Sequence, residues 1–184
     1  MDDTRGQIRA AALDLFTKQG YEPTSLREIA DRVGITKASL YYHYPSKQAL
    51  LLALVEPLVR EWRDLAAAAV AQPPTTANRR AMVAGYLDMM IGHRPVASML
   101  TRDAAATVPA LAPLIGDLNE VFRSVQTWLA GPDPTNRDRI RAHATLETIG
   151  AALSAAGMLP DVTDAELRET LLEAALAVLP DRPD

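Results

Sequence analysis

The stretch "GITKASLYYHYPSK", from Gly34 to Lys47, gathers side chains that can bind a phosphate backbone and the edges of bases. It contains two of the chain's three lysines, three tyrosines, a histidine and three hydroxyl-bearing residues, and it contains no acidic residue. Lysine, histidine and hydroxyl groups donate to phosphate oxygens and base acceptors, and aromatic surfaces contact the thymine methyl group. These residue types in this spacing indicate nucleic-acid binding.

The distribution of charge supports the same interpretation. The whole chain has a net charge of −4, which argues weakly against a nonspecific binder of polyanions. Residues 1–50 carry seven Lys and Arg against six Asp and Glu, whereas residues 51–184 carry twelve against seventeen. Because local charge decides where a phosphate backbone docks, the first fifty residues suit DNA better than the rest.

Catalytic chemistry finds little support in the sequence. The absence of cysteine excludes disulfides, thiolate nucleophiles and cysteine-ligated zinc. There is no glycine-rich phosphate loop, no GxSxG and no HExxH motif. The "HATLE" stretch puts His143 and Glu147 on one helix face, but an ordinary side-chain pair is the simpler interpretation. We therefore expect no catalytic residue, no metal site and no cofactor.

Residues that cap or end helices recur along the chain, and strand patterns are almost absent. Capping boxes are expected at Ser25–Glu28 and Thr163–Glu166, and Asp133–Pro134 reads as a cap followed by a helix-initiating proline. The clearest linker is "AQPPTTAN", residues 71–78. The periodic segments are a first helix ending at Gly20, then 26–33, 36–44, 46–70, 79–92, 95–105, 108–130, 134–156 and 164–179. The fold is predicted to be all-α with about nine helices.

The second and third segments have the spacing of a helix-turn-helix. Ala30 is small where the two helices would cross, and Gly34 stands where the turn requires positive φ. Leu40 is then placed to anchor the third helix in the core. The exposed face of that helix and the starts of the two flanking helices supply the expected DNA contacts. These are Thr36, Lys37, Ser39, Tyr41, Tyr42 and His43, with Ser25 and Lys47 at the helix starts, where free N–H groups attract phosphate. The alternative is that the tyrosines are packing residues.

The stretch "GYEPTSLREIADRVGITKASLYYHYPSKQALL", Gly20–Leu51, resembles the signature of the TetR family of transcriptional regulators. It departs from that signature at Ala38, where glycine is frequent, at Tyr44, where phenylalanine is usual, and at Gln48, where an acidic residue is usual. The resemblance implies a dimeric helix-turn-helix regulator, usually a repressor, that a small molecule bound to its C-terminal domain releases from DNA. It also implies that the eight residues named above face DNA or anchor phosphate.

We expect two domains, a DNA-binding domain at 1–50 with its helix-turn-helix at about 25–44, and a helical ligand-binding and dimerisation domain at 51–184. Adaptable methionines and aromatic side chains with single polar groups suit a small-molecule pocket. The candidate pocket residues are Trp62, Tyr86, Met89, Met90, His93, Met99, Phe122 and Trp128. Residues of these types at helical spacing are more often core than ligand contacts, and that alternative stays open.

The last two helices are expected to form a dimer interface. The apolar residues of the final helix cover a wider arc than a helix needs when it packs only against the core of its own monomer. The preceding helix is rich in small residues that allow close packing. The residues predicted to lie at this interface are Ala144, Ala151, Ala152, Ala155, Leu172 and Leu176. The alternative is a helix buried within its own monomer.

Pro57 interrupts the long fourth segment. Proline has no N–H for the Ala53 carbonyl and clashes with it, so a kink or break is expected there, serving as a static bend or as a hinge.

Together these observations favour a cytoplasmic, ligand-responsive DNA-binding regulator that binds a palindromic operator as a homodimer. Its N-terminus lacks the pattern of a signal peptide, and no apolar run is long enough to span a membrane. The alternatives are a ligand-independent DNA-binding adaptor protein and, less favoured, a helical small-molecule enzyme with an incidental helix-turn-helix.

Overall fold

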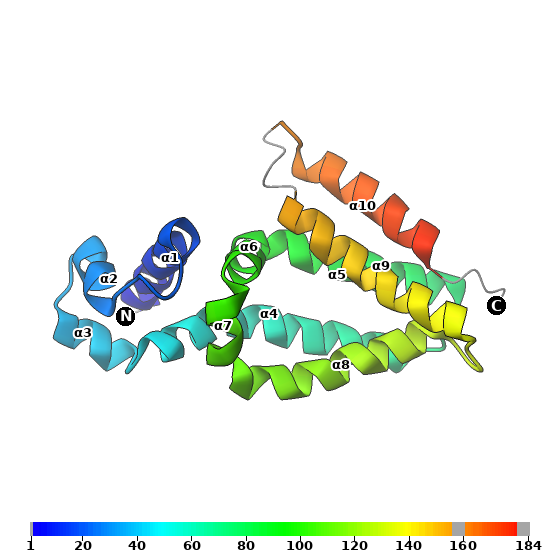
Figure 1. Ribbon diagram of the computed structural model, residues 1–184, viewed down its shortest axis with the longest axis horizontal. Helices are drawn as coiled ribbons and strands as arrows, with labels where there is room; N and C mark the ends of the chain where they lie inside the picture. Colours follow the sequence, from blue (N-terminus) through cyan, green and yellow to red (C-terminus); the bar gives the residue numbers. More distant parts are fainter. Residues whose placement is uncertain (1, 156–160, 180–184) are drawn as a thin grey trace. The chain divides into compact units, whose positions relative to one another are not determined.

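The computed structural model describes residues 2–155 and 161–179, which form ten helices and no strand (Figure 1). The helices are α1 (Asp2–Gln19), α2 (Leu26–Val33), α3 (Lys37–His43), α4 (Lys47–Val70), α5 (Thr76–Gly92), α6 (Arg94–Arg102), α7 (Ala104–Ala110), α8 (Ala112–Ala130), α9 (Asn136–Ala155) and α10 (Asp164–Val178). The prediction of an all-α fold is confirmed.

The chain forms two compact units, and they do not follow the expected division at residue 50. The first unit combines residues 1–57 with residues 95–115, and the second combines 58–94 with 116–184. Helices α6 and α7 therefore belong with the N-terminal helices. The helix α4 contributes its first half to one unit and its second half to the other.

The first unit is built on a small core from α1, α2, α3 and the start of α4. Ile8 and Phe16 of α1, Ile29 of α2, Leu40 of α3 and Leu50 of α4 are fully buried. The side chains recur at helical spacing in α1 and α2, so each helix turns one apolar face inward.

The core of the second unit is contributed by α5, α8, α9, α10 and the second half of α4. Helices α5, α9 and α10 pack against one another, and Figure 1 shows α8 running alongside the second half of α4. Val83, Leu87, Leu129, Leu146 and Ile149 are fully buried at the centre of this unit.

Several predicted helix boundaries are wrong. The helix α5 starts at Thr76, inside the predicted linker 71–78, because Thr75 caps it. The segments predicted at 95–105 and 108–130 form three helices, because the chain breaks at Asp103 and Leu111 and Pro109 is accommodated inside α7. The helix α9 starts at Asn136, because Thr135 and Asp138 cap it reciprocally; the hydroxyl of Thr135 accepts from the Asp138 N–H at 3.2 Å.

The expected break at Pro57 is absent. α4 runs as one helix from Lys47 to Val70 with Pro57 inside it. Because proline lacks an N–H, the Ala53 carbonyl still loses its helical donor. The point of division between the two compact units falls at this same residue.

Candidate nucleic-acid interface

The turn between α2 and α3 has the local geometry that the sequence predicts. The Ser25 hydroxyl accepts from the Glu28 N–H at 3.2 Å, and the Glu28 carboxylate accepts from the Ser25 N–H at 2.7 Å. Gly34 ends α2 with φ of 77°, and its N–H donates to the carbonyls of Ala30 and Asp31. A residue with a side chain is strained at this φ, so glycine fixes where α2 stops and α3 can begin.

The helix α3 has one buried face and one exposed face. Leu40 has no exposed surface, and Tyr44 at the end of the helix is also buried. Tyr42 by contrast is 85% exposed and Tyr41 is 42% exposed. The alternative of packing tyrosines therefore holds for Tyr44, whereas Tyr41 and Tyr42 present their rings at the surface.

The remaining predicted residues of α3 lie around these two rings. Thr36 caps the helix, its hydroxyl accepting from the Ser39 N–H at 3.1 Å, and the Lys37 ammonium lies 5.5 Å from the centre of the Tyr41 ring. Thr36 and Lys37 are exposed, while Ser39 and His43 are half-buried. The six predicted residues, at the start and within α3, thus all keep exposed or half-buried side chains, and the helix carries no carboxylate of its own.

His43 has an unusual environment within this segment. Its ring packs edge-on against Tyr42 with the ring centres 5.5 Å apart. Its Nδ1 atom is buried and has no hydrogen-bond partner among the residues that the structure describes. The other ring nitrogen is the one left to reach a phosphate.

Lys47 is more strongly engaged within the protein than its predicted role suggests. Its ammonium donates to the carbonyls of Tyr21 and Glu22, each at 2.9 Å, and lies 4.4 Å from the centre of the Tyr21 ring. Two of its three donors therefore hold the turn between α1 and α2 against the start of α4. Its predicted phosphate contact stays a prediction and depends on the third donor.

Sequence reasoning missed three residues in this unit. Arg27 projects from the first turn of α2 with a largely exposed guanidinium, 3.9 Å from Asp31. The Asp103 carboxylate accepts from the Tyr21 N–H at 2.6 Å, and the Gln48 amide donates to the Ala110 carbonyl at 2.9 Å. For Arg27 the signal was its place two residues after the Ser25 cap. For Asp103 no local signal exists, because its partner is 82 residues away.

The turn at Gly20 explains how Asp103 reaches the Tyr21 N–H. Gly20 has φ of 96°, and a Cβ atom there would lie 3.3 Å from the Asp103 carboxylate. Glycine therefore provides both the left-handed turn and the room for the carboxylate. Asp103 and Lys47 bind the N–H and the carbonyl of the same residue, so Tyr21 joins α7 to the start of α4.

The N-terminal part of the chain resembles known regulators in sequence, and the whole chain resembles one in fold. Residues 8–54 match the profile described as "Bacterial regulatory proteins, tetR family". The crystal structure of Mycobacterium smegmatis AmtR superposes with a TM-score of 0.80 at 26% identity, covering 98% of this chain and 87% of AmtR. The chain belongs to the TetR family.

Two curated relatives of this TetR-family chain match its N-terminal segment. It is 44% identical over 55 residues to the HTH-type transcriptional activator FasR of Mycolicibacterium smegmatis, a stretch that covers 30% of this chain and 25% of FasR. It is 40% identical over 55 residues to the HTH-type transcriptional regulator RutR of Escherichia coli K12, covering 30% and 26%. The matched stretch spans about a quarter of each relative's length.

The residues predicted to bind a ligand gather in the second unit of this TetR-family protein, with one exception. The Trp62 ring lies 4.9 Å from that of Tyr86 and 4.7 Å from that of Phe122, measured between ring centres. Met89, Met90 and Trp128 belong to the same core cluster. Met99 is buried in the first unit instead, so it is not part of this group.

Polar contacts fix two of these side chains. The His93 Nε2 atom lies 2.8 Å from the Glu61 carboxylate. The indole N–H of Trp128 donates to the Gln72 carbonyl at 2.7 Å. Burial raises the pKa of the Tyr86 hydroxyl, and the nearby Glu147 carboxylate raises it further, so Tyr86 is a neutral donor at any ordinary pH.

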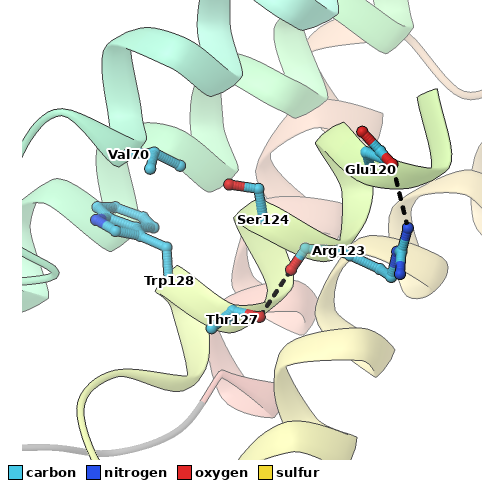
Figure 2. A pocket seen from close by; sticks show the side chains of 6 residues that line it. All are labelled: Val70, Glu120, Arg123, Ser124, Thr127 and Trp128. Carbon is cyan, nitrogen blue, oxygen red and sulfur yellow. Dashed lines mark hydrogen bonds and ion pairs between the residues drawn. The ribbon is translucent and has the colours of Figure 1, made fainter. Parts of the chain in front are cut away.

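Two surface hollows in this unit each enclose about 600 Å³. Figure 2 shows the first, where Val70 and Trp128 stand on one side and the Arg123 guanidinium points toward Glu120, 3.8 Å away. Both hollows are open to solvent and carry charged rims. Apart from Trp128, none of the predicted ligand-binding residues lines either one.

The residues predicted for the dimer interface lie on α9 and α10. Leu172 and Leu176 are half-buried and line the second hollow, between Arg80 of α5 and the charged residues of α10. Ala144 is half-buried and Ala151 is exposed. The side chains of Ala152 and Ala155 lie outside the described residues. The interface stays a prediction.

Within the described ranges, no group of three or more His, Asp and Glu side chains is arranged to hold a metal ion. In the same part of the chain, none of the helices combines the length and the hydropathy needed to cross a bilayer.

Proposed function

We propose that this TetR-family protein binds a two-fold symmetric operator as a homodimer, through the exposed face of α3 and the start of α2, and represses transcription there. A small molecule held among the core helices of the second unit lowers its affinity for DNA. The coarse role, a DNA-binding transcriptional regulator, follows from family membership.

The exposed surface of α3 is the observation that carries the proposal. Tyr42 is 85% exposed and Lys37, five residues earlier, is also exposed, on a helix without a carboxylate. Tyr41 and Tyr42 place two adjacent aromatic rings at the surface, and neighbouring exposed apolar groups often mark an interaction site. Beside a phosphate backbone and base edges, these rings and the Lys37 ammonium gain partners.

The position of residues 95–115 supports control by a small molecule. In the chain these residues lie between α5 and the main part of α8, which both belong to the second unit. They nevertheless bind the first unit through Asp103 and Gln48. A ligand that shifts α5 or α8 would therefore also shift residues 95–115, which are hydrogen-bonded to the turn at Tyr21 through Asp103.

Repression is the simpler of the two regulatory outcomes. A dimer that occupies promoter DNA blocks access without a further partner, whereas activation requires an additional contact with the transcription machinery. FasR, which shares the N-terminal segment, is described as a transcriptional activator, so this segment alone does not decide the outcome, and the location of the operator would.

The proposal is tested by selecting genomic fragments bound by the purified protein and mapping the protected bases. We expect a palindrome with half-site centres about 34–36 Å apart, one helical turn. Metabolites are then screened for release of that DNA. A single asymmetric half-site bound by one monomer would contradict the dimeric mode, and failure of every metabolite to release the DNA would favour a ligand-independent adaptor.

A further inference from the structure

The indole N–H of Trp62 is a buried donor without an acceptor. Trp62 is 2% exposed, and its Nε1 atom has no hydrogen-bond partner among the residues that the structure describes. Buried polar groups in proteins are nearly always paired, and leaving one unpaired costs about 1–3 kcal/mol. An orphaned N–H in the core therefore calls for a partner from outside the chain.

The other tryptophan provides an internal comparison. Trp128 is also buried in the second unit, yet its Nε1–H donates to the Gln72 carbonyl at 2.7 Å. The fold can therefore satisfy an indole donor where packing is its only role. Trp62 has no such acceptor among the described residues.

The neighbours of Trp62 define the chemistry of the missing partner. The rings of Tyr86 and Phe122 lie tilted against it, with ring centres 4.9 and 4.7 Å away, which gives an aromatic, apolar surround. Of the three rings only that of Phe122 is half-buried rather than buried, so the route from solvent lies on its side. A planar, largely apolar molecule suits such a surround.

We propose that the effector is a neutral aromatic or similarly flat molecule whose carbonyl or ether oxygen accepts the Trp62 indole hydrogen bond, beside the rings of Phe122 and Tyr86. This inference rests on the proposed ligand control and specifies the class of ligand that exerts it. The ligand supplies the acceptor that the protein leaves out.

The charge of the ligand separates this class from its rivals. An anionic ligand would lose its hydration beside the buried Trp62 and Tyr86 side chains, and burying a charge is costly. A cation would gain from the rings but cannot accept from the indole N–H. A neutral acceptor carries no charge into the site and can accept the hydrogen bond from the indole N–H.

Three probes of one size test the inference on the full-length protein. Acetophenone carries a neutral acceptor, ethylbenzene has a similar shape without one, and benzoate carries a charged acceptor. Binding is measured without DNA from the two indole N–H signals in ¹⁵N NMR spectra, which the variants Trp62→Phe and Trp128→Phe assign. Trp128→Phe is the matched control because it removes an indole donor that is already paired.

We expect acetophenone to bind about tenfold more tightly than ethylbenzene and benzoate, because only acetophenone satisfies the donor without burying a charge. It should move the Trp62 indole signal downfield and leave that of Trp128 in place. Trp62→Phe should abolish the preference for acetophenone, and Trp128→Phe should keep it. The comparison of probes in the unmodified protein stands even if Trp62→Phe folds poorly.

Equal binding of acetophenone and ethylbenzene, tighter binding of benzoate, or no binding of any probe up to its solubility limit would each overturn the inference. The proposed function fails separately. A protein that binds no operator but still shows the acetophenone effect at Trp62 would refute the regulatory role and keep the ligand class. A protein that binds its operator but shows no acetophenone effect at Trp62 would refute the ligand class and keep the regulatory role.

Discussion

Individual residues of the first unit divide into those that hold the turn and those left free to reach DNA. Leu40 and Tyr44 are buried, whereas Lys37 and Tyr42 on the same short helix are exposed. Lys47 belongs to the first group, because its ammonium is bound by two carbonyls of the α1–α2 turn.

Lys47→Ala tests that structural role. Loss of two charge-assisted hydrogen bonds at a partly buried ammonium should lower the free energy of unfolding by about 1–2 kcal/mol. Lys18→Ala is the matched control, since Lys18 is exposed and forms a surface ion pair with Asp14, and should change stability by less than about 0.5 kcal/mol. Chemical denaturation monitored by circular dichroism measures both. Equal effects of the two substitutions would show that Lys47 does not hold the turn.

Local rules explain which residues could be predicted from the sequence. The Ser25 cap, the positive φ of Gly34 and the burial of Leu40 each depend on neighbours within a few positions. The contact of Asp103 with Tyr21 and the engagement of Lys47 depend on residues brought together by the tertiary fold. Single-sequence periodicity contains no information on those pairs.

Helices α2 and α10 begin with the same capping box, yet in different units. The hydroxyl of Ser25 binds the Glu28 N–H, and that of Thr163 binds the Glu166 N–H, both at 3.2 Å. The two caps were predictable because the motif is local. The splitting of residues 95–130 into three helices was not, because Pro109 can be read either as a helix breaker or as a first-turn residue.

Ser25→Ala and Thr163→Ala form a matched pair. Each should cost about 1 kcal/mol of stability, because each removes a side chain that caps a helix. Only Ser25→Ala should also weaken operator binding, since the start of α2 is predicted to meet a phosphate. Denaturation and fluorescence anisotropy with operator DNA measure the two effects. Unchanged affinity of Ser25→Ala at a protein concentration where it is folded would remove Ser25 from the interface.

The ion pair between α5 and α10 should make stability depend on pH. Arg168 donates to both carboxylate oxygens of Asp88, and this hydrogen bonding holds the pKa of Asp88 below its ordinary value of 3.8. A lowered folded-state pKa means that the contribution is fully present above pH 3.8 and is lost as the pH falls through the lowered value.

The free energy of unfolding of Asp88→Asn, compared with that of the unmodified protein, tests this dependence. Asp88→Asn should be the less stable protein at about pH 7, and the difference should shrink toward about pH 3 as the carboxyl becomes protonated. A difference that stays constant over this range would mean that the pair with Arg168 contributes nothing that depends on charge.

The whole molecule connects its two compact units through three chain crossings. They lie at Pro57 within α4, between Arg94 and Pro95, and between Ile115 and Gly116. The segment 95–105, which the sequence assigned to the second domain, belongs to the first unit. Asp103 accepts from the Tyr21 N–H, and the Ala110 carbonyl accepts from the Gln48 amide, so this part of the chain is bound to the N-terminal helices.

The proposed dimer is tested on opposite faces of α10. Leu172→Glu would bury an unpaired charge in a face predicted to be interfacial and should dissociate the dimer at micromolar concentration, at a cost of several kcal/mol. Ala174→Glu places the same charge at an exposed position about 200° around the helix and should leave the dimer intact. Sedimentation equilibrium measures both. A folded Leu172→Glu protein that remains dimeric would exclude this face of α10.

The salt dependence of operator affinity is the measurement that tests the DNA-binding surface most directly. It compares the unmodified protein with Lys37→Ala on α3 and Lys18→Ala on α1, each over a range of salt concentrations. Lys37→Ala should weaken binding and reduce the slope of log affinity against log salt by about one unit, because one phosphate or base contact is lost. Lys18→Ala should leave both quantities unchanged. A folded Lys37→Ala protein with unaltered affinity and slope would contradict the assignment of α3 as the surface that binds DNA.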